Sequence, residues 1–531
     1  MTDRAAEPWG RCLATGAVAV LASVSSASLV ATWASIDTPL AAVATRVINA
    51  APPSVKHWAI STFAKHDKLV LGIGIAILLW LGASAMARLS PRSAAVIPIG
   101  VAAFGIVGLV SVSQSGPATY LASPIGAVVG WVSFRVLLGT RPRLVAAPAQ
   151  ATEATPGSTP RSMHRAMPRN RWEAPVDRRQ FMARAAALSA GGATLGAISI
   201  GAANSRDVQI RRAAGKLPVI PPGADAAEAI GPDATVDAGV TPFITPNGKF
   251  YKIDTTFVSP RVDLNDWRLK IHGRVEHPLE LSFDDLLHRH VVERVVTLCC
   301  VSNEVGGDLI GNARWMGVPL AELLKEASPH ADATQVAMTS VDGWTCGFPT
   351  ELALDGRDAL VVIGMNGEPL PIDHGFPVRI VVPGLYGYVS ATKWVSEIEL
   401  TTLEAFDGYW IDQGWAKNGP VKTQSRIDVP RQGERLRAGK QAIAGIAWAQ
   451  HRGITKVEVR VNGGEFVEAR LGAGVSTDAW RQWIYEWDAA PGDHHIEVRA
   501  TDGRGATQTS EEAPPAPDGA TGYHLVSVSV S

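Results

Sequence analysis

The chain of 531 residues is longer than a single hydrophobic core usually supports, which predicts two to four domains. Its 49 Lys and Arg residues balance 50 Asp and Glu residues, so the net charge of −1 gives no electrostatic basis for a nucleic-acid partner. The mean hydropathy is slightly positive, which is high for a soluble enzyme and is explained by long apolar stretches near the N-terminus.

Five apolar stretches each come close to the ~20 residues that cross a bilayer as a helix. Ionisable residues fall at their ends, as at Lys68, Arg88 and Arg135. The alternative, buried helices of a soluble core, fits poorly because such helices rarely stay this free of charge. The five expected membrane spans are 11–33, 69–87, 94–113, 118–138 and 182–203.

Basic residues gather before the first span, between the second and third, and between the fourth and fifth. This pattern predicts a cytoplasmic N-terminus and places everything after Arg206 outside. Segment 34–67 is compatible with an interfacial helix, and a further crossing there would reverse the topology. The basic linker 141–181 ends in DRRQFM, where Arg178 and Arg179 resemble a twin-arginine export signal. A stop-transfer arginine cluster is the alternative.

After a Pro-, Gly- and Ala-rich tether, the remainder of the chain shows two successive sequence patterns. Strand-like runs first mix with helical stretches, one of which begins at Ser282 with acidic residues in its first turn. Short strands separated by turns follow, and NGGE at 462–465 predicts a hairpin. Their tryptophans are expected in a core or an interface: Trp448, Trp480, Trp483 and Trp487.

Two of the four cysteines, Cys299 and Cys300, are adjacent in TLCCVSNEVGG at the end of an expected strand. A structural zinc site needs about four ligands at spacings such as CxxC, and only Cys346 lies nearby. A redox CxxC is absent, and a nucleophile needs a base that sequence does not reveal. Because successive strand residues face opposite sides, one cysteine can be core while the other faces a pocket. Two inert buried cysteines remain the alternative.

Three runs around these cysteines resemble the molybdenum-cofactor domain of the sulfite oxidase family: TLCCVSN, GNARWMGVPLAELL at 311–324 and NGEPLPIDHGFPVRIVVPGLYGYVSATKW at 366–394. Later runs, including VEVRVNGGEF, AWRQWIYEW and HIEVRATDGRG, resemble the C-terminal dimerisation domain of that family. The resemblance implies a molybdenum–molybdopterin cofactor and a homodimer formed through the C-terminal domain. It does not extend to the membrane part.

The resemblance also implies roles for particular residues. Matching CVSN to the family's motif of a cysteine, small residues and an asparagine makes Cys300 the thiolate ligand of molybdenum and leaves Cys299 for the core. The dithiolene of the pterin fills two more metal positions. The remaining implied cofactor contacts are His374 and Arg379 at the pterin, Thr392 and Lys393 at its phosphate, and, more weakly matched, Tyr251 and Ser340.

The chain departs from sulfite oxidases where those enzymes bind their anionic substrate. Glu304, Val305 and Asp254 stand at positions where they have arginines, and Trp415 stands near the position of their active-site tyrosine. A cytochrome b5-like haem domain is also missing. The periplasmic methionine-sulfoxide reductase subunit lacks the same arginines, although it lacks the dimerisation domain. These departures favour a neutral substrate such as a sulfoxide or N-oxide, with Asn303 donating to its oxygen and Trp415 forming an apolar wall.

The sequence therefore predicts a membrane-anchored molybdenum oxidoreductase that performs oxo-transfer on a small sulfur- or nitrogen-containing molecule outside the cytoplasm. The five spans contain no histidine pair for haem, so a separate electron-transfer protein or a quinone is the expected electron partner. The alternatives are a sulfite oxidase with an altered anion pocket and a non-enzymatic scaffold or binding module.

The expected fold class is multidomain: all-α membrane helices, then a mixed α+β molybdopterin domain, then an immunoglobulin-like β-sandwich. The expected segments are four spans in 1–140, a linker in 141–181, a fifth span in 182–203, a tether in 204–245, the molybdopterin domain in 246–410, a linker in 411–424 and the sandwich in 425–531.

Overall fold

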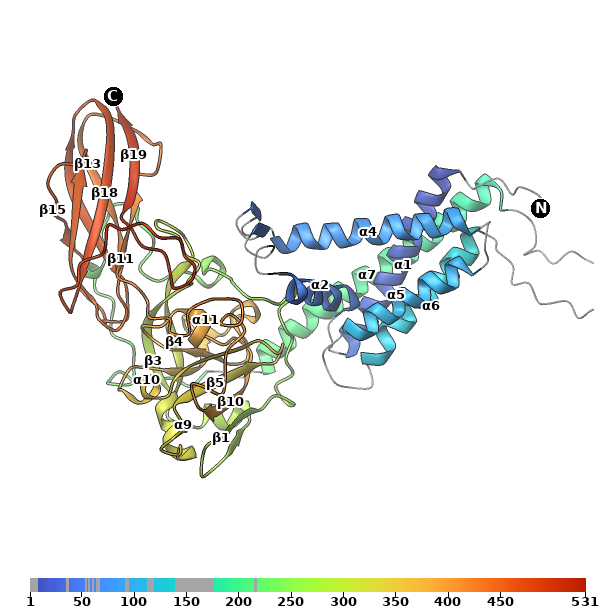
Figure 1. The fold of residues 1–531 in the computed structure, drawn as a ribbon, viewed down its shortest axis with the longest axis horizontal. Helices are drawn as coiled ribbons and strands as arrows, with labels where there is room; N and C mark the ends of the chain where they lie inside the picture. Colours follow the sequence, from blue (N-terminus) through green and yellow to red (C-terminus); the bar gives the residue numbers. More distant parts are fainter. Residues whose placement is uncertain are drawn as a thin grey trace, which may run out of the picture. The chain divides into compact units, whose positions relative to one another are not determined.

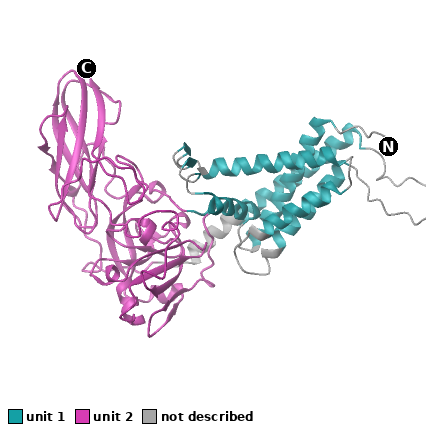
Figure 2. Ribbon diagram, in the orientation of Figure 1, with its two compact units in different colours: residues 1–206, 255–258 teal, residues 207–254, 259–531 magenta. Residues whose placement is uncertain are grey.

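A computed structural model describes residues 8–34, 38–52, 55, 58–59, 62–63, 67–90, 95–111, 119–138, 176–213 and 217–531. The chain divides into two compact units (Figure 2). The first comprises residues 1–206 with 255–258, and the second comprises 207–254 with 259–531. Most of the basic linker expected at 141–181 lies outside the described residues.

The first unit is helical (Figure 1). Its helices pack closely where small residues meet: Gly126 lies against Ala27, where a Cβ atom would come within 2.8 Å of the Ala27 methyl carbon. The Ser23 hydroxyl donates a hydrogen bond to the carbonyl oxygen of Gly126 at 2.8 Å, and this bond joins the same two helices. The helices are α1 (Trp9–Ala34), α2 (Pro39–Ala50), α4 (Asp67–Leu89), α5 (Val96–Ser111), α6 (Thr119–Leu138) and α7 (Arg178–Ala213).

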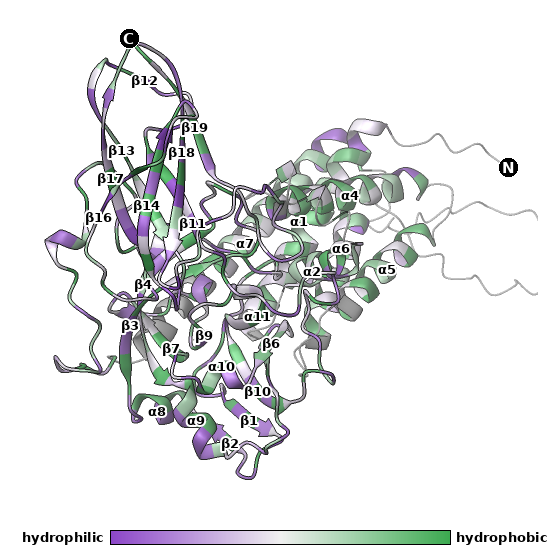
Figure 3. Cartoon of the chain, turned by 60° about the vertical axis from the view of Figure 1, so that its left-hand side comes forward, coloured by the Kyte–Doolittle hydropathy of each residue, from purple (hydrophilic) through white to green (hydrophobic). Residues whose placement is uncertain are grey.

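Four described helices are long and apolar enough to cross a membrane: 9–33, 68–89, 121–138 and 178–202. The third expected span, 94–113, corresponds to α5, whose described part has 16 residues. Large apolar side chains on these helices are exposed, with Leu78 at 70% and Ile99 at 66%. Figure 3 shows how strongly apolar these helices are in comparison with the strands of the second unit. Apolar surface on this scale needs a hydrocarbon environment or a partner.

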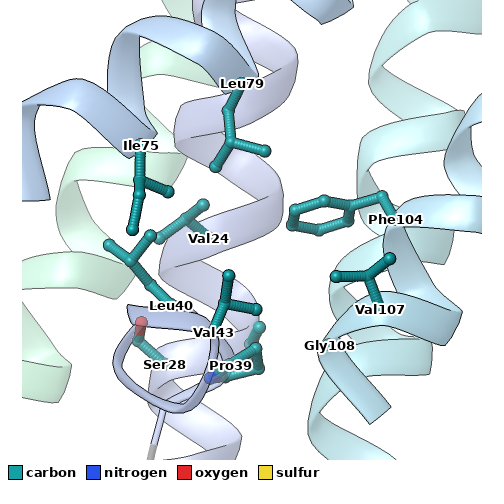
Figure 4. Close-up of a pocket in the computed structure, with 11 residues that line it drawn as sticks. Val24, Ser28, Pro39, Leu40, Val43, Ile75, Leu79, Phe104, Val107 and Gly108 are labelled. Atoms are coloured by element: carbon teal, nitrogen blue, oxygen red, sulfur yellow. The ribbon is translucent and has the colours of Figure 1, made fainter. Parts of the chain in front are cut away.

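The segment expected as an interfacial helix at 34–67 contains α2, which begins at the cap residue Thr38. The Thr38 hydroxyl accepts from the backbone N–H of Ala41, and Pro39 occupies the first turn. A cavity of about 60 Å³ lies between α2 and its neighbours α1, α4 and α5 (Figure 4). Apart from Ser28, the residues that line the cavity are apolar or glycine. The cavity is therefore a gap between hydrocarbon side chains.

The second unit begins with a mixed region built on two sheets (Figure 1). The first sheet has the order β2-β1-β10-β5-β6: β2 (Leu279–Leu281), β1 (Leu269–Gly273), β10 (Val395–Thr401), β5 (Gln335–Ser340) and β6 (Thr345–Pro349). The second has the order β3-β4-β7-β8, with β9 paired to β7: β3 (Val292–Cys299), β4 (Ile310–Pro319), β7 (Leu360–Met365), β8 (Glu368–Pro369) and β9 (Arg379–Val381).

Short helices connect these strands, and their ends follow the sequence signals. Ser282 is the cap of α8 (Phe283–Leu287), and the Ser282 and Asp285 side chains each bond the other residue's backbone N–H. Another of these helices is α9 (Leu320–Ala327), whose apolar residues face the core. The others are α10 (Glu351–Leu354) and α11 (Gly387–Ser390). The mixed α/β prediction for this region is therefore confirmed.

The C-terminal part is β-rich, as predicted, and its two sheets enclose a common apolar core. The NGGE hairpin joins β14 to β15, and Asn462 and Gly463 both adopt positive φ there. All four tryptophans of this part are buried. One sheet contains β11 (Gln424–Val429), β13 (Gly439–Trp448), β17 (Arg481–Ala489) and β16 (Arg470–Leu471); the other contains β12 (Arg435–Leu436), β19 (His524–Val530), β18 (Gly492–Asp502), β14 (Ile454–Val461) and β15 (Val467–Glu468).

Residues 217–245, within the segment expected as a tether, make specific contacts in the second unit. The backbone N–H of Thr245 donates to Asn312 O on β4 at 2.8 Å, and that of Thr241 donates to Asp428 Oδ2 on β11 at 2.9 Å. Phe243 is 5% exposed, and its carbonyl oxygen accepts from the indole N–H of Trp480 at 3.0 Å. This segment thus connects the mixed region to the β-rich part.

Candidate functional site

Cys300 lies directly after β3, where the strand leaves the sheet. Cys299 pairs with Ile310 on β4, and the backbone N–H of Cys300 donates to Leu309 O at 2.9 Å. Both side chains are buried, at 3% and 9% exposure. Burial raises the pKa of both thiols, although hydrogen bonds from Ser302 partly oppose the rise at Cys300. A thiolate at Cys300 therefore requires a nearby positive charge, such as a metal ion, to stabilise it.

The loop after Cys300 is held by its own backbone and by Asn303. The N–H of Asn303 donates to Cys300 O at 3.0 Å, and its side-chain Oδ1 accepts from the N–H of Leu309 at 2.8 Å. The Asn303 Nδ2 atom is buried and has no hydrogen-bond partner within the described chain. Since a buried donor left without an acceptor costs about 1–3 kcal/mol, this amide is suited to a ligand.

Tyr251, His374 and Arg379 lie around Phe250 and Trp315; His374 and Arg379 are buried, and Tyr251 is partly buried. The Phe250 ring lies 5.2 Å from the Tyr251 ring, 5.6 Å from the His374 ring and 5.6 Å from the Trp315 ring. The Arg379 guanidinium stacks over Trp315 at 5.0 Å. Burial raises the pKa of Tyr251, the Cys300 charge raises it further, and the Arg379 charge lowers it, so this group lies close to the cysteine pair.

Arg379 has hydrogen-bonding capacity to spare. Its Nη1 donates to His374 O at 3.2 Å, while its Nε is buried and has no partner among the described residues. Burial lowers the pKa of Arg379 to about 10, so the side chain remains charged at neutral pH. Burial also lowers the pKa of His374 to about 4, and its Nε2 bonds Asn247 O at 2.9 Å. A neutral histidine and a charged arginine thus face the same interior.

Lys393 makes a buried ion pair that the sequence did not indicate. Its Nζ donates to Asp254 Oδ2 at 2.7 Å and to Asp373 O at 3.1 Å, and it lies 4.6 Å from the centre of the Trp394 ring. The two paired side chains are only 11% and 4% exposed. Asp254, which stands where sulfite oxidases have an arginine, therefore has its negative charge neutralised by Lys393. Glu304, at another position where those enzymes have an arginine, is exposed.

Thr392 and Ser340 lie in the surroundings of this ion pair. Thr392 is fully buried, and its hydroxyl lies 3.1 Å from the Cys346 sulfur. Ser340 Oγ accepts weakly from the N–H of Asp342 at 3.5 Å. Burial raises the pKa of Asp342, and the Asp254 charge raises it further while Lys393 lowers it. The expected phosphate residues therefore share one region with two carboxyl groups.

Trp415 packs in an aromatic group with Tyr388 and Trp410. Its ring centre lies 5.9 Å from that of Tyr388 and 6.2 Å from that of Trp410. The Tyr388 hydroxyl donates to Ala416 O at 2.5 Å, and Trp415 itself is 9% exposed. This burial suits the apolar wall that the sequence predicts.

Tyr386, which precedes α11 in the mixed region, and Asp518 of the β-rich part are residues that the sequence did not single out. Burial raises the pKa of Tyr386, and the charges of Cys299, Asp518 and Cys300 raise it further. Tyr386 therefore lies near the cysteine pair. Its hydroxyl accepts from the N–H of Lys422 at 3.4 Å, and Lys422 Nζ pairs with Asp518 at 2.9 Å. These contacts join positions up to 96 residues apart, so no local pattern announces them.

Comparisons with known proteins identify the family of the domain that contains this site. Residues 256–410 match the oxidoreductase molybdopterin binding domain family. An uncharacterized oxidoreductase of Bacillus subtilis is 34% identical over 157 residues, which are 30% of this chain and 76% of that protein. The chain belongs to the sulfite oxidase family of molybdopterin oxidoreductases. Human mitochondrial sulfite oxidase is 29% identical over 303 residues, which cover 48% of this chain. The chain spans only 55% of that relative's length.

A solved structure, the sulfane dehydrogenase SoxCD from Paracoccus pantotrophus, matches at 23% identity. The match covers 58% of this chain and 86% of that one, at a TM-score of 0.46.

The chain is an oxidoreductase of this family, and its cofactor is molybdenum bound to molybdopterin. The residues present fit that group. Cys300 offers a sulfur ligand, and Asn303 Nδ2 and Arg379 Nε are buried donors that lack partners among the described residues. No group of three or more His, Cys, Asp or Glu side chains in the described chain could hold a metal ion. A cofactor that brings its own dithiolene sulfurs suits a single protein cysteine.

Proposed function

We propose that this chain is a membrane-anchored oxidoreductase that performs oxo-transfer on a small polar molecule containing sulfur or nitrogen. The observation that carries the proposal is the group of Cys300, Tyr251, His374 and Arg379, with donors on Asn303 and Arg379 left for a ligand. When bound, the molybdenum cofactor supplies two-electron redox chemistry. The chain's own residues bind and orient that cofactor and exclude water from it.

Each side chain has a proposed task in holding the cofactor. Cys300 ligates the metal through its thiolate, while Cys299 packs in the core. Arg379 and His374 orient the pterin, with Tyr251 and Ser340 as further contacts. Lys393 and Thr392 bind the phosphate, for which an ammonium is a suitable partner.

The expected substrate is neutral because the two lysines near the site already have carboxylate partners, while the buried, charged Arg379 is assigned to the cofactor. Lys393 pairs with Asp254, and Lys422 pairs with Asp518. A dianion moved into such a site without a free cation would pay several kcal/mol of desolvation. A sulfoxide or N-oxide avoids that cost, and the free Asn303 amide offers its oxygen a donor. Trp415 supplies the apolar wall.

A sulfite oxidase with an altered pocket is the second candidate, since the human relative carries that name. Steady-state kinetics with artificial electron carriers separate the two candidates. A kcat/KM for sulfite of ~10⁴ M⁻¹s⁻¹ or more, in the ordinary enzyme range, would establish the second candidate and remove the first.

The helical unit anchors the enzyme in the bilayer, with the catalytic unit on the extracytoplasmic side. Four helices of suitable length and apolarity support the anchoring. Arg178 and Arg179, at the start of α7, are exposed and serve as a twin-arginine export signal. Electrons reach or leave the site through a separate protein or a quinone, and the β-rich part mediates a homodimer.

Molybdenum analysis of the purified full chain tests the assignment of the ligand. We expect about one molybdenum per chain, lost in Cys300→Ala and Cys300→Ser and retained in Cys299→Ala. The Cys299 variant is the matched control, because it removes a neighbouring buried thiol from the same strand end. Molybdenum retained with equal activity in Cys300→Ala would overturn the assignment.

A further inference from the structure

The loop that follows Cys300 touches the β-rich part through two side chains that have no role in the proposed cofactor contacts. Arg426 Nη1 donates to Gly307 O at 2.8 Å. His524 packs on Gly306, where a Cβ atom would come within 2.3 Å of the imidazole Nε2. Gly306 also has φ +77, so its backbone conformation favours glycine. The loop therefore has both its shape and its position fixed at these two residues.

Arg426 is itself held rigidly on β11. Its Nε bonds Asp428 Oδ1 at 2.7 Å, and its Nη2 donates to Thr241 Oγ1 at 2.8 Å. The residue is 9% exposed. Three acceptors from three segments therefore use the planar guanidinium at once, a geometry that a lysine ammonium does not reproduce.

His524 begins β19, which lies in the other sheet. Its Nδ1 accepts from the N–H of Ile427 at 2.9 Å, which joins the first and last strands of the β-rich part. Burial lowers the pKa of His524 to about 4, so the ring is neutral at neutral pH and Nδ1 can accept this bond. The two loop contacts are thus coupled through neighbouring residues of β11.

We propose that Arg426 and His524 are positioning residues for the loop 301–307, so that the β-rich part fixes the geometry of the metal-binding cysteine. This proposal rests on the assignment of Cys300 as the molybdenum ligand. It gives the β-rich part a task within each chain, in addition to the dimer contact proposed for it. The loop's own bonds shape its turn, while Arg426 and His524 restrain it from outside.

Hydrogen exchange on the cofactor-loaded full chain measures this restraint. In Arg426→Gln, the amides of residues 300–309 should exchange about tenfold faster, because a charged hydrogen bond no longer opposes local opening. Arg426→Lys should restore only part of the protection. Arg481→Gln is the matched control, since Arg481 donates to Gly472 O and Ile454 O within the β-rich part and not to the loop. Equal loop exchange in the Arg426→Gln and Arg481→Gln variants would overturn the proposal.

A second variant, His524→Asn, tests the proposal even if Arg426→Gln does not fold. His524→Asn keeps an acceptor near the Nδ1 position and removes the ring that packs on Gly306, so loop exchange should again rise. The spectrum of the bound molybdenum should shift in Arg426→Gln and His524→Asn and stay unchanged in Arg481→Gln. Unshifted spectra and unchanged exchange would refute the positioning role, whereas molybdenum retained in Cys300→Ala would refute the ligand assignment separately.

Discussion

The ion pair between Lys393 and Asp254 makes a quantitative prediction about the stability of the second unit. Both side chains are almost fully buried, and the nitrogen and oxygen atoms are 2.7 Å apart. Replacing Asp254 with Asn removes the negative partner and leaves the ammonium with the Asp373 carbonyl oxygen among its acceptors. Breaking a buried pair on one side costs about 3–5 kcal/mol. For a unit of roughly 320 residues, about 3 kcal/mol corresponds to a fall in Tm of roughly 4–5 °C.

A double-mutant cycle measures the pair separately from its surroundings. Asp254→Asn and Lys393→Met should each lower Tm, and the combined variant should lose less than the sum because neither buried charge then remains. Thermal unfolding of the full chain in detergent, followed by tryptophan fluorescence, provides the assay. Additive losses within about 0.5 kcal/mol would show that the two side chains do not interact, contrary to the structure.

The same thermal unfolding experiment can be carried out with and without the bound cofactor. The proposed phosphate site at Lys393 would give the ammonium a second anion, so cofactor-loaded Asp254→Asn should lose only about half as much Tm as the cofactor-free variant. Removing the carboxylate should also strengthen phosphate binding, because a like charge next to the phosphate is lost. An equal loss of Tm in the loaded and cofactor-free variants would place the phosphate elsewhere.

Three further predictions concern acid stability, substrate charge and export. The pKa of His374 is lowered to about 4 in the folded chain, against about 6.5 unfolded, so the unfolded chain takes up the proton first and stability falls as pH drops from 6.5 towards 4. His374→Gln should flatten the plot of Tm against pH, and parallel plots would contradict a neutral buried ring. Asp518→Asn should raise kcat/KM for sulfite relative to a sulfoxide about two- to fivefold at low salt, because Lys422 loses a partly exposed partner; a constant ratio would exclude this pair from the substrate path. Replacing Arg178 and Arg179 with Lys should trap a C-terminal reporter inside the cell if export is by the twin-arginine route, and normal export would limit them to setting topology.

Local signals predicted the elements of the second unit well. The cap at Ser282 and the turn at Asn462 and Gly463 appear where turn and capping chemistry place them. The strand ending at Cys299 and the burial of the four tryptophans of the β-rich part also follow from residue type and spacing. These features depend on interactions between residues close in sequence, or on hydrophobic burial alone.

The surroundings of the site depend on contacts that sequence spacing does not encode. The Lys393–Asp254 bond joins positions 139 residues apart, and the Arg426–Gly307 bond joins positions 119 apart. The sequence shows that Asp254 carries a carboxylate, but it does not show that Lys393 is the partner of that carboxylate. The sequence could assign different tasks to the adjacent cysteines because successive strand residues face opposite sides. Both side chains are buried in the structure, and the assignment of the metal ligand stays a prediction.

The charged side chains around the site differ in whether they have a carboxylate partner, and this difference bears on which anion they could bind. Lys393 and Lys422 have carboxylate partners, and the Lys422 pair is also open to solvent, where an ion pair contributes little. Arg379 is buried instead; its hydrogen-bond acceptor is the His374 carbonyl, and its Nε is left without a partner among the described residues. The cationic group with unused capacity therefore lies in the interior beside Tyr251, not at an entrance. Under the proposed function, positive charge placed there would stabilise a permanently held anionic cofactor and would do little to attract an anionic substrate from solution. On this argument, an anion pocket would have to be created by mutation, and Asp518 is the position at which the structure offers a cation to release.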